Sequence, residues 1–348
     1  MIHKNVYGIR SKSIRDALTH DDYDLTDRPM NVFSTTEIID SPKSRVLSRR
    51  HDSEIIVDIS DNFHLMDGSA VHYALERSNK NSEAQRLSEE RIFIEVGIDD
   101  KPWRVFTVNP GEKIIAQPWY REHVLYVSCK FDNYEIDDMV VEDYKRCSVW
   151  ETIYGLKDSR IQQLNIAAIG LNMLGFPVEK IRACLLLKDW SAVSLRQDEQ
   201  KGGDTYPKIP YKEYDFPVWP ADQTKAYIFE RAFIHSNAHR MGDDEIPECN
   251  EEERWYRGEA FAVMKTGVKT AKKVFRVEAG SMPKEDAKKY AEDHARELQS
   301  VAKKGETFFV EERPGQDIRC GGDKSYCSAR TFCHYWVSKY GNKNNSEY

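Results

Sequence analysis

The sequence predicts an α/β protein in which a mixed β-sheet is flanked by helices. Apolar and polar residues alternate in several segments between residues 91 and 144, as they do in half-buried strands. Segments with helical periodicity lie before and after these strands, and an aliphatic run at 181–187 is typical of a buried strand. This order of helix, strands, helix and strand favours a sheet with helices on its faces.

The first predicted helix begins at Ser34. Ser34 and Glu37 have the spacing of a capping box, in which each side chain bonds the backbone N–H of the other residue. A second helix is predicted from Gly68 to Glu76. Its buried side is expected to consist of Ala70, Val71, Ala74 and Leu75.

The next segments have the period of strands. Residues 91–96 and 103–108 are predicted to pair around a turn at 99–102. Residues 124–131 and 139–144 are predicted to form a second strand pair.

Helical periodicity returns after residue 157. Asp158 is a candidate N-cap, and Gly175 suits the left-handed conformation that often ends a helix. Residues 200–221 are rich in glycine and proline, which predicts a long surface excursion. A further helix is predicted at 224–239.

The domain organisation follows from these elements. Residues 1–30 are polar and predict a loosely ordered arm, and 31–240 form the predicted α/β core. Residues 241–340 are charged and are expected to be mainly helical, with a cluster of cysteines, and 341–348 form a polar tail.

Composition limits the classes of function. The chain has no run of about 18 apolar residues, so we expect no membrane partner. Its start lacks the apolar stretch of a secretory signal, which favours a cytoplasmic location. It has no P-loop motif for ATP hydrolysis, so any helicase activity would come from a partner.

The formal net charge of −7 gives no general support for nucleic-acid binding, so local groups of basic residues matter more. Such groups can neutralise phosphates, although a basic face is often only a solvated surface. The first group is Lys43, Arg45, Arg49 and Arg50, and the second is Lys265, Lys269, Lys272, Lys273 and Arg276.

Two acids and a lysine carry the strongest chemical signal. Asp143 and Lys145 are two apart in a predicted strand and therefore share a face. Pairing of 124–131 with 139–144 would bring Asp132 beside Asp143, and such a pair suits Mg²⁺. The metal would activate a water and polarise a phosphate, while Lys145 stabilises the developing charge. The pattern predicts metal-dependent phosphodiester cleavage, and the alternative is a D-x-K tripeptide that occurs by chance.

Three further residues flank this group. His72 and Glu76 are four apart on a predicted helix and reach the same side. His72 is a candidate metal ligand, and Glu76 would orient it or bind the ion through water. Gln163 lies early in the helix after the D-x-K strand, where it could touch the site or a phosphate. Each of these residues alone is more often an ordinary surface group.

Together these residues have the order G-x-x-x-H-x-x-x-E, D, D-x-K and Q-L-N. In this order, and in the segments VSCKFDNYEIDDMVVEDYKRCSVWE, QQLNIAAIGLNMLGF and LLLKDWS, the chain resembles the PD-(D/E)XK nuclease superfamily. The resemblance is closest to RecB-like exonucleases of phages and prophages, and it covers about residues 34–336. It implies a restriction-endonuclease-like core and a DNA exonuclease that requires Mg²⁺ or Mn²⁺.

The resemblance also implies roles for single residues. His72, Asp132, Asp143 and the backbone carbonyl of Tyr144 would be metal ligands, and Asp132, Asp143, Lys145 and Gln163 would be the catalytic set. The implied setting is DNA recombination, replication or repair in a bacterium or a phage-infected cell, with a recombinase or helicase as a possible partner. Two alternatives remain, which are an RNA-directed nuclease and a non-catalytic DNA-binding or adaptor protein that keeps the nuclease fold.

The C-terminal region contains three closely spaced cysteines. Cys320, Cys327 and Cys333 are separated by six and five residues, and Cys249 lies further upstream. Four thiolates can hold an iron–sulfur cluster or a structural Zn²⁺. These gaps are wider than those of most zinc sites, which favours a 4Fe-4S cluster, with Zn²⁺ and unligated thiols as alternatives. The other three cysteines are predicted to pack in the core. They are Cys129, Cys147 and Cys184.

Overall fold

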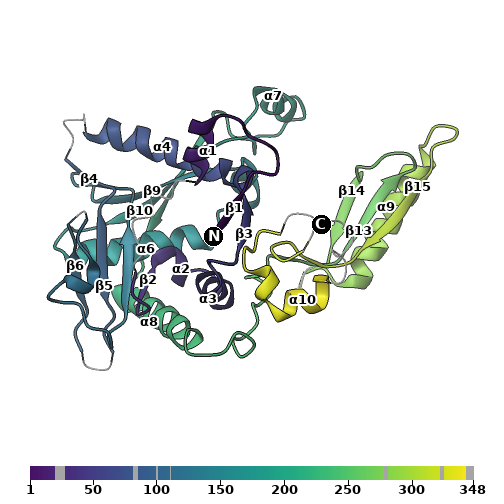
Figure 1. Cartoon of the computed structure of the whole chain (residues 1–348). Coiled ribbons are helices and arrows are strands. Elements are labelled where there is room, and N and C mark those ends of the chain that lie inside the picture. Colours follow the sequence, from purple (N-terminus) through teal and green to yellow (C-terminus); the bar gives the residue numbers. More distant parts are fainter. Residues whose placement is uncertain are drawn as a thin grey trace. The chain divides into compact units, whose positions relative to one another are not determined.

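The chain folds into two compact units, Met1–Ile246 and Pro247–Tyr348, in a computed structural model (Figure 1). The structure describes residues 1–19, 28–80, 85–98, 101–109, 111–277, 281–321 and 325–341. The mixed α/β class is confirmed, because mixed sheets alternate with helices along the chain. The predicted turn at 99–102 lies partly outside the described residues, as does nearly all of the tail at 341–348.

The first unit contains two main sheets. One has the strand order β2-β7-β5-β6 and the other the order β11-β10-β9-β8-β4, while β1 and β3 form a separate parallel pair. The strands are β1 (Ile2–Lys4), β2 (Val32–Ser34), β3 (Ile56–Asp58), β4 (Arg86–Ser88), β5 (Arg91–Glu95), β6 (Arg104–Thr107), β7 (Tyr126–Lys130), β8 (Asn133–Glu135), β9 (Val140–Cys147), β10 (Lys180–Leu187) and β11 (Tyr211–Pro217).

Helices cover both sheets. The α-helices of this unit are α1 (Lys12–Thr19), α2 (Thr35–Ile38), α3 (Pro42–Arg50), α4 (Phe63–Lys80), α5 (Trp150–Tyr154), α6 (Asp158–Met173), α7 (Ala192–Gln200) and α8 (Ala221–Ala238), and the 3₁₀ turns are η1 (Ile59–Asn62) and η2 (Ile114–Ala116). Helix α4 packs against β9, and α8 packs against α6 and α3 (Figure 1).

The helix α6 forms the centre of the core. It packs against strands of both sheets, and a continuous run of its residues from Leu164 to Leu171 is buried. A helix that is apolar on all sides is stable only when it is covered on all sides. Its C-terminal Gly175 has a φ of 89°, as predicted, whereas its N-cap is Lys157 and Asp158 is the first helical residue. The helix therefore joins the two sheets through one apolar core.

The predicted strand pairs are partly right. β5 and β6 pair antiparallel as expected. The pairing of 124–131 with 139–144 is wrong, because β7 pairs with β2 and β5, and β9 pairs with β8 and β10. The short strand β8 follows β7 directly and forms the hairpin with β9. The sequence signal of β8 was too short to separate from that of β7.

Two neighbouring extended segments, residues 86–95 and 126–135, each pass from one sheet into the other. β4 pairs with β8 in one sheet, and β5 pairs with β7 in the other. The two strand pairs have the same register. Ser88 faces Asn133, and three residues further along one segment and three residues back along the other, Arg91 faces Lys130. Two backbone hydrogen bonds bridge the gap, from the Glu89 N–H to the Asp132 carbonyl at 3.1 Å and from the Phe131 N–H to the Glu90 carbonyl at 3.2 Å. One antiparallel ladder therefore spans both sheets.

The glycine- and proline-rich segment contains a strand that was not predicted. β11 pairs antiparallel with β10, which in turn runs parallel to β9. Tyr214 and Phe216 are half-buried and alternate with exposed charged residues, which is the pattern of an edge strand. The prediction of a continuous surface excursion at 200–221 is therefore wrong.

The capping box at the start of α2 is confirmed. The Ser34 hydroxyl accepts a hydrogen bond from the Glu37 N–H at 3.1 Å, and the Ser34 N–H donates to the Glu37 carboxylate at 3.4 Å. The helix predicted at 68–76 begins earlier, at Phe63, and its buried side is different. Ala70 and Ala74 are exposed, while Val71 and Leu75 are half-buried.

The predicted loosely ordered arm is wrong for residues 1–19. β1 pairs in parallel with β3, and Leu18 of α1 is buried. The Leu18 carbonyl accepts a hydrogen bond from the Asn62 side chain at 2.8 Å. Pairing with a distant strand and burial of one leucine fix this segment despite its polar composition. Residues 20–27 lie outside the described part.

The second unit is built around a sheet and is not mainly helical, so that prediction is wrong. Its three-stranded antiparallel sheet has the order β14-β13-β15 and packs against one long helix, α9. The apolar run of β13 is buried and pairs on both sides. The elements are β12 (Tyr256–Arg257), β13 (Ala260–Lys265), β14 (Lys273–Arg276), α9 (Lys284–Ser300), β15 (Phe308–Arg313), β16 (Gln316–Asp317), η3 (Arg330–Phe332) and α10 (His334–Tyr340).

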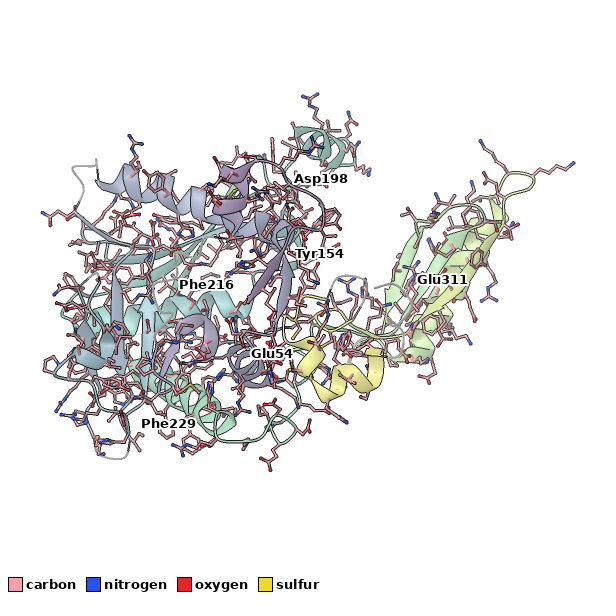
Figure 2. The ribbon with its side chains drawn as sticks, in the orientation of Figure 1. Glu54, Tyr154, Asp198, Phe216, Phe229 and Glu311 are labelled. Atoms are coloured by element: carbon pink, nitrogen blue, oxygen red, sulfur yellow. The ribbon has the colours of Figure 1, made fainter. Side chains whose placement is uncertain are left out.

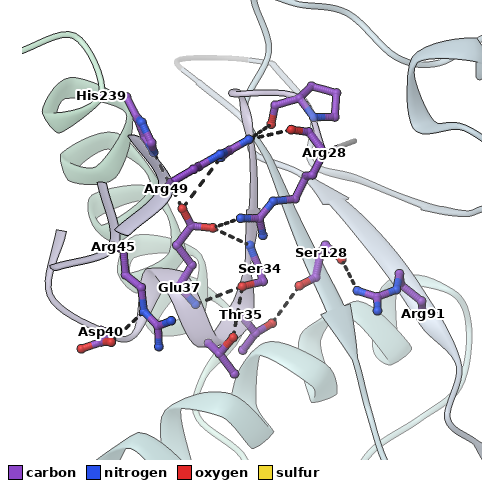
Figure 3. A network of polar contacts seen from close by, with 12 residues as sticks. Arg28, Ser34, Thr35, Glu37, Asp40, Arg45, Arg49, Arg91, Ser128 and His239 are labelled. Carbon is purple, nitrogen blue, oxygen red and sulfur yellow. Dashed lines mark hydrogen bonds and ion pairs between the residues drawn. The ribbon is translucent and has the colours of Figure 1, made fainter. Parts of the chain in front are cut away.

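A buried ionic network surrounds Glu37 at the start of α2 (Figure 3). The Glu37 carboxylate contacts the Arg28 guanidinium and lies 3.9 Å from Nη1 of Arg49 and 3.7 Å from Nε2 of His239. Arg49 also donates to the carbonyls of Arg28 and Pro29. Burial alone would raise the pKa of Glu37, but these partners outweigh it and lower the pKa to about 2.

The first basic group serves the fold and is not a free phosphate-binding surface. Lys43 is buried and donates to the Ile246 carbonyl at 2.9 Å. Arg45 pairs with Asp40, and Arg50 pairs with Asp243 and donates to nearby backbone carbonyls. These contacts hold α3 against α8 and the chain that follows it.

We expect Glu37→Gln to lower the free energy of unfolding by about 3 kcal/mol at pH 7, because the variant leaves two arginines without their buried anion. A carboxylate with a lowered pKa stabilises the fold above its unfolded pKa, and this contribution disappears as the pH falls from about 4.5 towards about 2. Urea denaturation at several pH values measures both effects. The control is Glu54→Gln, whose exposed carboxylate should contribute at most about 1 kcal/mol.

Candidate functional site

The strand crossover brings Asp132 beside Asp143. Asn133 faces Glu142 in the β8–β9 ladder, and one step further the register places Asp132 opposite Asp143. Both side chains are buried, and Oδ2 of Asp132 accepts a hydrogen bond from the Tyr144 N–H at 2.6 Å. The hairpin between β8 and β9 thus holds two carboxylates together without the strand pair that the sequence predicted.

Lys145 joins the two acids. Its ammonium donates a hydrogen bond to Oδ1 of Asp143 and lies 3.9 Å from Oδ2 of Asp132. Burial would lower the pKa of Lys145, but the two carboxylates outweigh it and raise that pKa. Lys145 is therefore held as a cation. The structure brings together the three side chains on which the sequence hypothesis depends.

The site remains short of positive charge. Burial raises the pKa of Asp132 to about 6, with a smaller contribution from Asp143, although Lys145 and His72 act in the opposite direction. Oδ2 of Asp143 is buried, and it forms no hydrogen bond within the described part of the chain. An anionic oxygen without a partner in a buried site suits a cation. These oxygens therefore fit a divalent metal ion.

His72, Glu89 and Asp132 form a possible metal site, and Asp143 is not a member of this group. Nδ1 of His72 lies 3.1 Å from Oε1 of Glu89 and 3.7 Å from Oδ1 of Asp132. Ligand atoms of these three residues lie within 4.8 Å of one another, and no other described residues form such a group. The pKa of His72 is raised, chiefly by its contact with Glu89. Imidazole and carboxylate oxygens can hold Mn²⁺ or Mg²⁺.

Glu89 was missed by the sequence analysis. It stands opposite Asp132 in the crossing ladder, and its φ of 58° is unusual for a residue other than glycine. Burial opposes ionisation, but contacts with His72 and Lys130 outweigh it and lower the pKa of Glu89. Its partner is 43 residues away, so only knowledge of the strand register could have identified it.

The remaining predicted residues lie around this group. Gln163 is half-buried on α6, but within the described residues no hydrogen bond joins it to Asp132 or Asp143. Arg160 lies on the same helix and pairs with Glu151 at 3.2 Å. Its positive charge acts to lower the pKa of Lys145. Glu76 is half-buried one turn beyond His72, whereas Nδ1 of His72 contacts Glu89.

The Tyr144 carbonyl stays a predicted ligand. Tyr144 lies between Asp143 and Lys145 on β9, and its hydroxyl donates to Glu142 at 2.9 Å. The His72 ring meets the Tyr144 ring edge-on, with centroids 6.5 Å apart. These contacts fix the strand beside the histidine.

The four C-terminal cysteines lie in the second unit. Burial raises the pKa of Cys320 to about 12, and the thiols of Cys327, Cys249 and Cys333 contribute to the increase, so the four are neighbours. In the described part of the chain, no three of their sulfur atoms lie within 4.8 Å of one another. Zinc with four thiolates requires sulfur atoms about 3.8 Å apart. The present arrangement thus forms neither a zinc site nor a cluster site.

The other three cysteines are buried core residues, as predicted. None of the seven cysteines, all of which lie in the described ranges, forms a disulfide. Within those ranges the chain also has no helix whose length and apolar content would let it cross a bilayer.

Comparisons with known proteins assign no family. The sequence matches no family model and no curated protein. Among solved structures, the chain is similar to one entitled "Crystal structure of SSO0001", with 12% sequence identity and a TM-score of 0.38. The match covers 64% of this chain and 83% of the other. This likeness is too distant to support a conclusion about the site.

We expect Glu89→Gln to weaken Mn²⁺ binding by about 10- to 100-fold, because the variant removes one of the anionic groups around His72. Binding should also weaken as the pH falls below about 6, where the Asp132 carboxyl takes up a proton. Isothermal titration calorimetry with MnCl₂ measures both effects. The matched control is Glu90→Gln, since the neighbouring Glu90 is exposed. Equal losses in the two variants would contradict a role for Glu89 as a ligand.

Proposed function

We propose that this protein is a metal-dependent nuclease that hydrolyses phosphodiester bonds in DNA with Mg²⁺ or Mn²⁺. The observation that supports it most strongly is the convergence of Asp132, Asp143 and Lys145 at one buried point. His72 and Glu89 form a possible metal group with Asp132, while Asp143 lies outside that group. Carboxylates with an ammonium group in contact suit a substrate that carries negative charge and develops more of it during the reaction.

Each residue has a distinct part in the proposed mechanism. Asp132, Asp143, His72 and Glu89 would hold the metal ion, which supplies an activated water and polarises the phosphate when bound. Lys145 remains protonated beside Asp143 and stabilises the charge that develops on the phosphate oxygens. Glu89 orients the His72 imidazole through Nδ1.

The proposed fold type is restriction-endonuclease-like. Its support is a mixed sheet in which the D-x-K strand β9 runs parallel to β10 and antiparallel to β8, with α6 packed against it. Exonuclease activity, a role in phage or prophage DNA recombination, replication or repair, a recombinase or helicase partner and a cytoplasmic location rest on the sequence resemblance. RNA as the substrate is the alternative with the same chemistry.

The second basic group supports contact with phosphates. Lys269 and Lys272 lie between β13 and β14, are exposed and form no ion pair within the described residues. Lys265 is paired with Glu306 at 2.7 Å, and the Lys273 ammonium lies 5.1 Å from the centre of the Phe275 ring. Free surface lysines would add salt-sensitive affinity for DNA.

We further propose a 4Fe-4S cluster on Cys249, Cys320, Cys327 and Cys333, with Zn²⁺ as the alternative. The support is the spacing of the four cysteines in the sequence and their position in one unit, where the thiols of Cys327, Cys249 and Cys333 contribute to the raised pKa of Cys320. The cluster would fasten the segment around α10 to the start of the second unit.

We expect Asp143→Asn and Lys145→Ala each to reduce DNA cleavage by about 10³-fold, because each removes a group that holds the metal or meets the developing charge. The assay is digestion of end-labelled linear and circular DNA with Mg²⁺, with EDTA as the metal-free arm. An exonuclease digests only the linear form. The control is Asp138→Asn in the exposed turn between β8 and β9.

Full activity in either site variant would refute the assignment of these residues. DNA binding by the wild type that persists in EDTA, without cleavage in Mg²⁺, would instead indicate the non-catalytic DNA-binding alternative. Circular dichroism of each variant checks that the fold is retained.

We expect the protein purified without oxygen to be brown and to contain iron, and Cys327→Ser to lose most of that iron. Iron analysis and visible absorption measure this outcome. Cys184→Ala, which changes a buried thiol of β10 in the first unit, should keep the iron. A colourless wild-type protein with stoichiometric zinc would replace the cluster with a zinc site.

A further inference from the structure

Two exposed aromatic side chains lie on the short helix α5, directly after the strand that carries Asp143 and Lys145. Trp150 is 53% exposed and Tyr154 is 82% exposed. Their rings are stacked, with centroids 5.7 Å apart and planes 18° from parallel. The proposed mechanism uses neither side chain, and large apolar groups at such exposure often mark a binding surface.

The helix that carries this pair is fixed on its other side. Val149 is buried, and the Asp189 carboxylate accepts hydrogen bonds from the Val149 N–H and the Ser148 hydroxyl, each at 2.6 Å. Glu151 pairs with Arg160 of α6. The rings are therefore presented to solvent from an anchored backbone, which reduces the conformational entropy lost when a ligand stacks on them.

The aromatic pair is close to the candidate active site. Trp150 follows Lys145 by five residues, so extended chain limits the separation of their backbones to about 17 Å. Arg160 of α6 lies near both regions. It pairs with Glu151 of α5, and its positive charge acts to lower the pKa of Lys145. The backbone N–H of the exposed Lys188 donates to the Cys147 carbonyl at the end of β9. The segment after β10 therefore lies beside the chain that leads into α5.

We propose that Trp150 and Tyr154 form a stacking platform for unpaired bases of the DNA strand whose backbone enters the metal site. Every base has an aromatic face, so such a platform accepts any sequence. Stacked rings on an anchored backbone suit the flat faces of bases, and their place directly after the strand of Asp143 and Lys145 suits a DNA strand that enters the metal site. This inference rests on the proposed nuclease function and identifies single-stranded DNA as the form that is bound.

The test is binding of a single-stranded oligonucleotide with 2-aminopurine near one end, measured in EDTA so that no cleavage occurs. The double variant Trp150→Ala/Tyr154→Ala is expected to bind about fivefold to 150-fold more weakly and to lose the fluorescence quenching that stacking causes. Trp150→Phe/Tyr154→Phe keeps both rings and should keep most of the affinity. A blunt duplex without unpaired bases should bind equally well to all variants.

The matched control is Phe233→Ala on α8. Phe233 is 49% exposed and stacks on Phe229, with centroids 5.9 Å apart, so it is a similar surface pair on another helix. Figure 2 labels Tyr154 and Phe229, which lie well apart on the first unit. The control should leave binding and quenching unchanged. The single variant Tyr154→Ala, at the more exposed position, provides the same test if the double variant does not fold.

The outcomes separate the platform from the nuclease assignment. Unchanged binding and quenching in the aromatic variants would overturn the platform, even when Asp143→Asn abolishes cleavage. An equal loss of affinity for the blunt duplex would also overturn it, because the loss would not depend on unpaired bases. A wild-type protein that binds and quenches the oligonucleotide but never cleaves DNA would uphold the platform and refute the nuclease.

Discussion

The continuous antiparallel ladder from β4–β8 into β5–β7 is the constraint on which the candidate site depends. Both segments leave one sheet and enter the other at the same point, and the hydrogen bonds at Glu89 and Phe131 keep their register through the crossing. Glu89 and Asp132 occupy the crossing, and β9 supplies Asp143 and Lys145 from the adjacent edge of the hairpin.

The crossing also explains how several charged groups stay buried together. Oδ2 of Asp132 accepts the Tyr144 N–H, and its carbonyl accepts the Glu89 N–H, so neighbouring backbone fixes the residue at both ends. Lys145 supplies one positive charge to two carboxylates. His72 reaches Asp132 from α4, a helix packed on β9. The protein thus fixes the anions through its backbone and leaves part of their charge uncompensated.

Sequence reasoning succeeded where the signal is local. The capping box at Ser34, the strand β10 and the shared face of Asp143 and Lys145 depend on residues within a few positions of one another. It failed where the signal is a pairing between distant segments. The three-residue strand β8 and the role of Glu89 follow from a register that only the folded chain defines. Likewise, the basic residues of α3 looked free because their acidic and carbonyl partners lie up to 203 residues away.

Two buried acids in the first unit show why one network is structural and the other suits a ligand. Glu37 and Asp132 are both less than a tenth exposed. Two arginines and a histidine surround Glu37 and lower its pKa to about 2, so the fold itself stabilises that charge. Burial raises the pKa of Asp132 to about 6, with a smaller contribution from the neighbouring Asp143.

Folding leaves Asp132 and Asp143 in an arrangement that disfavours two negative charges. An arrangement of this kind is retained only where another interaction compensates for it, and perturbed acids of this sort concentrate at functional sites. A bound divalent cation would remove the repulsion between the acids and occupy the unpartnered Oδ2 of Asp143. The electrostatics that disfavour two negative charges would therefore favour a small cation of high charge at this point.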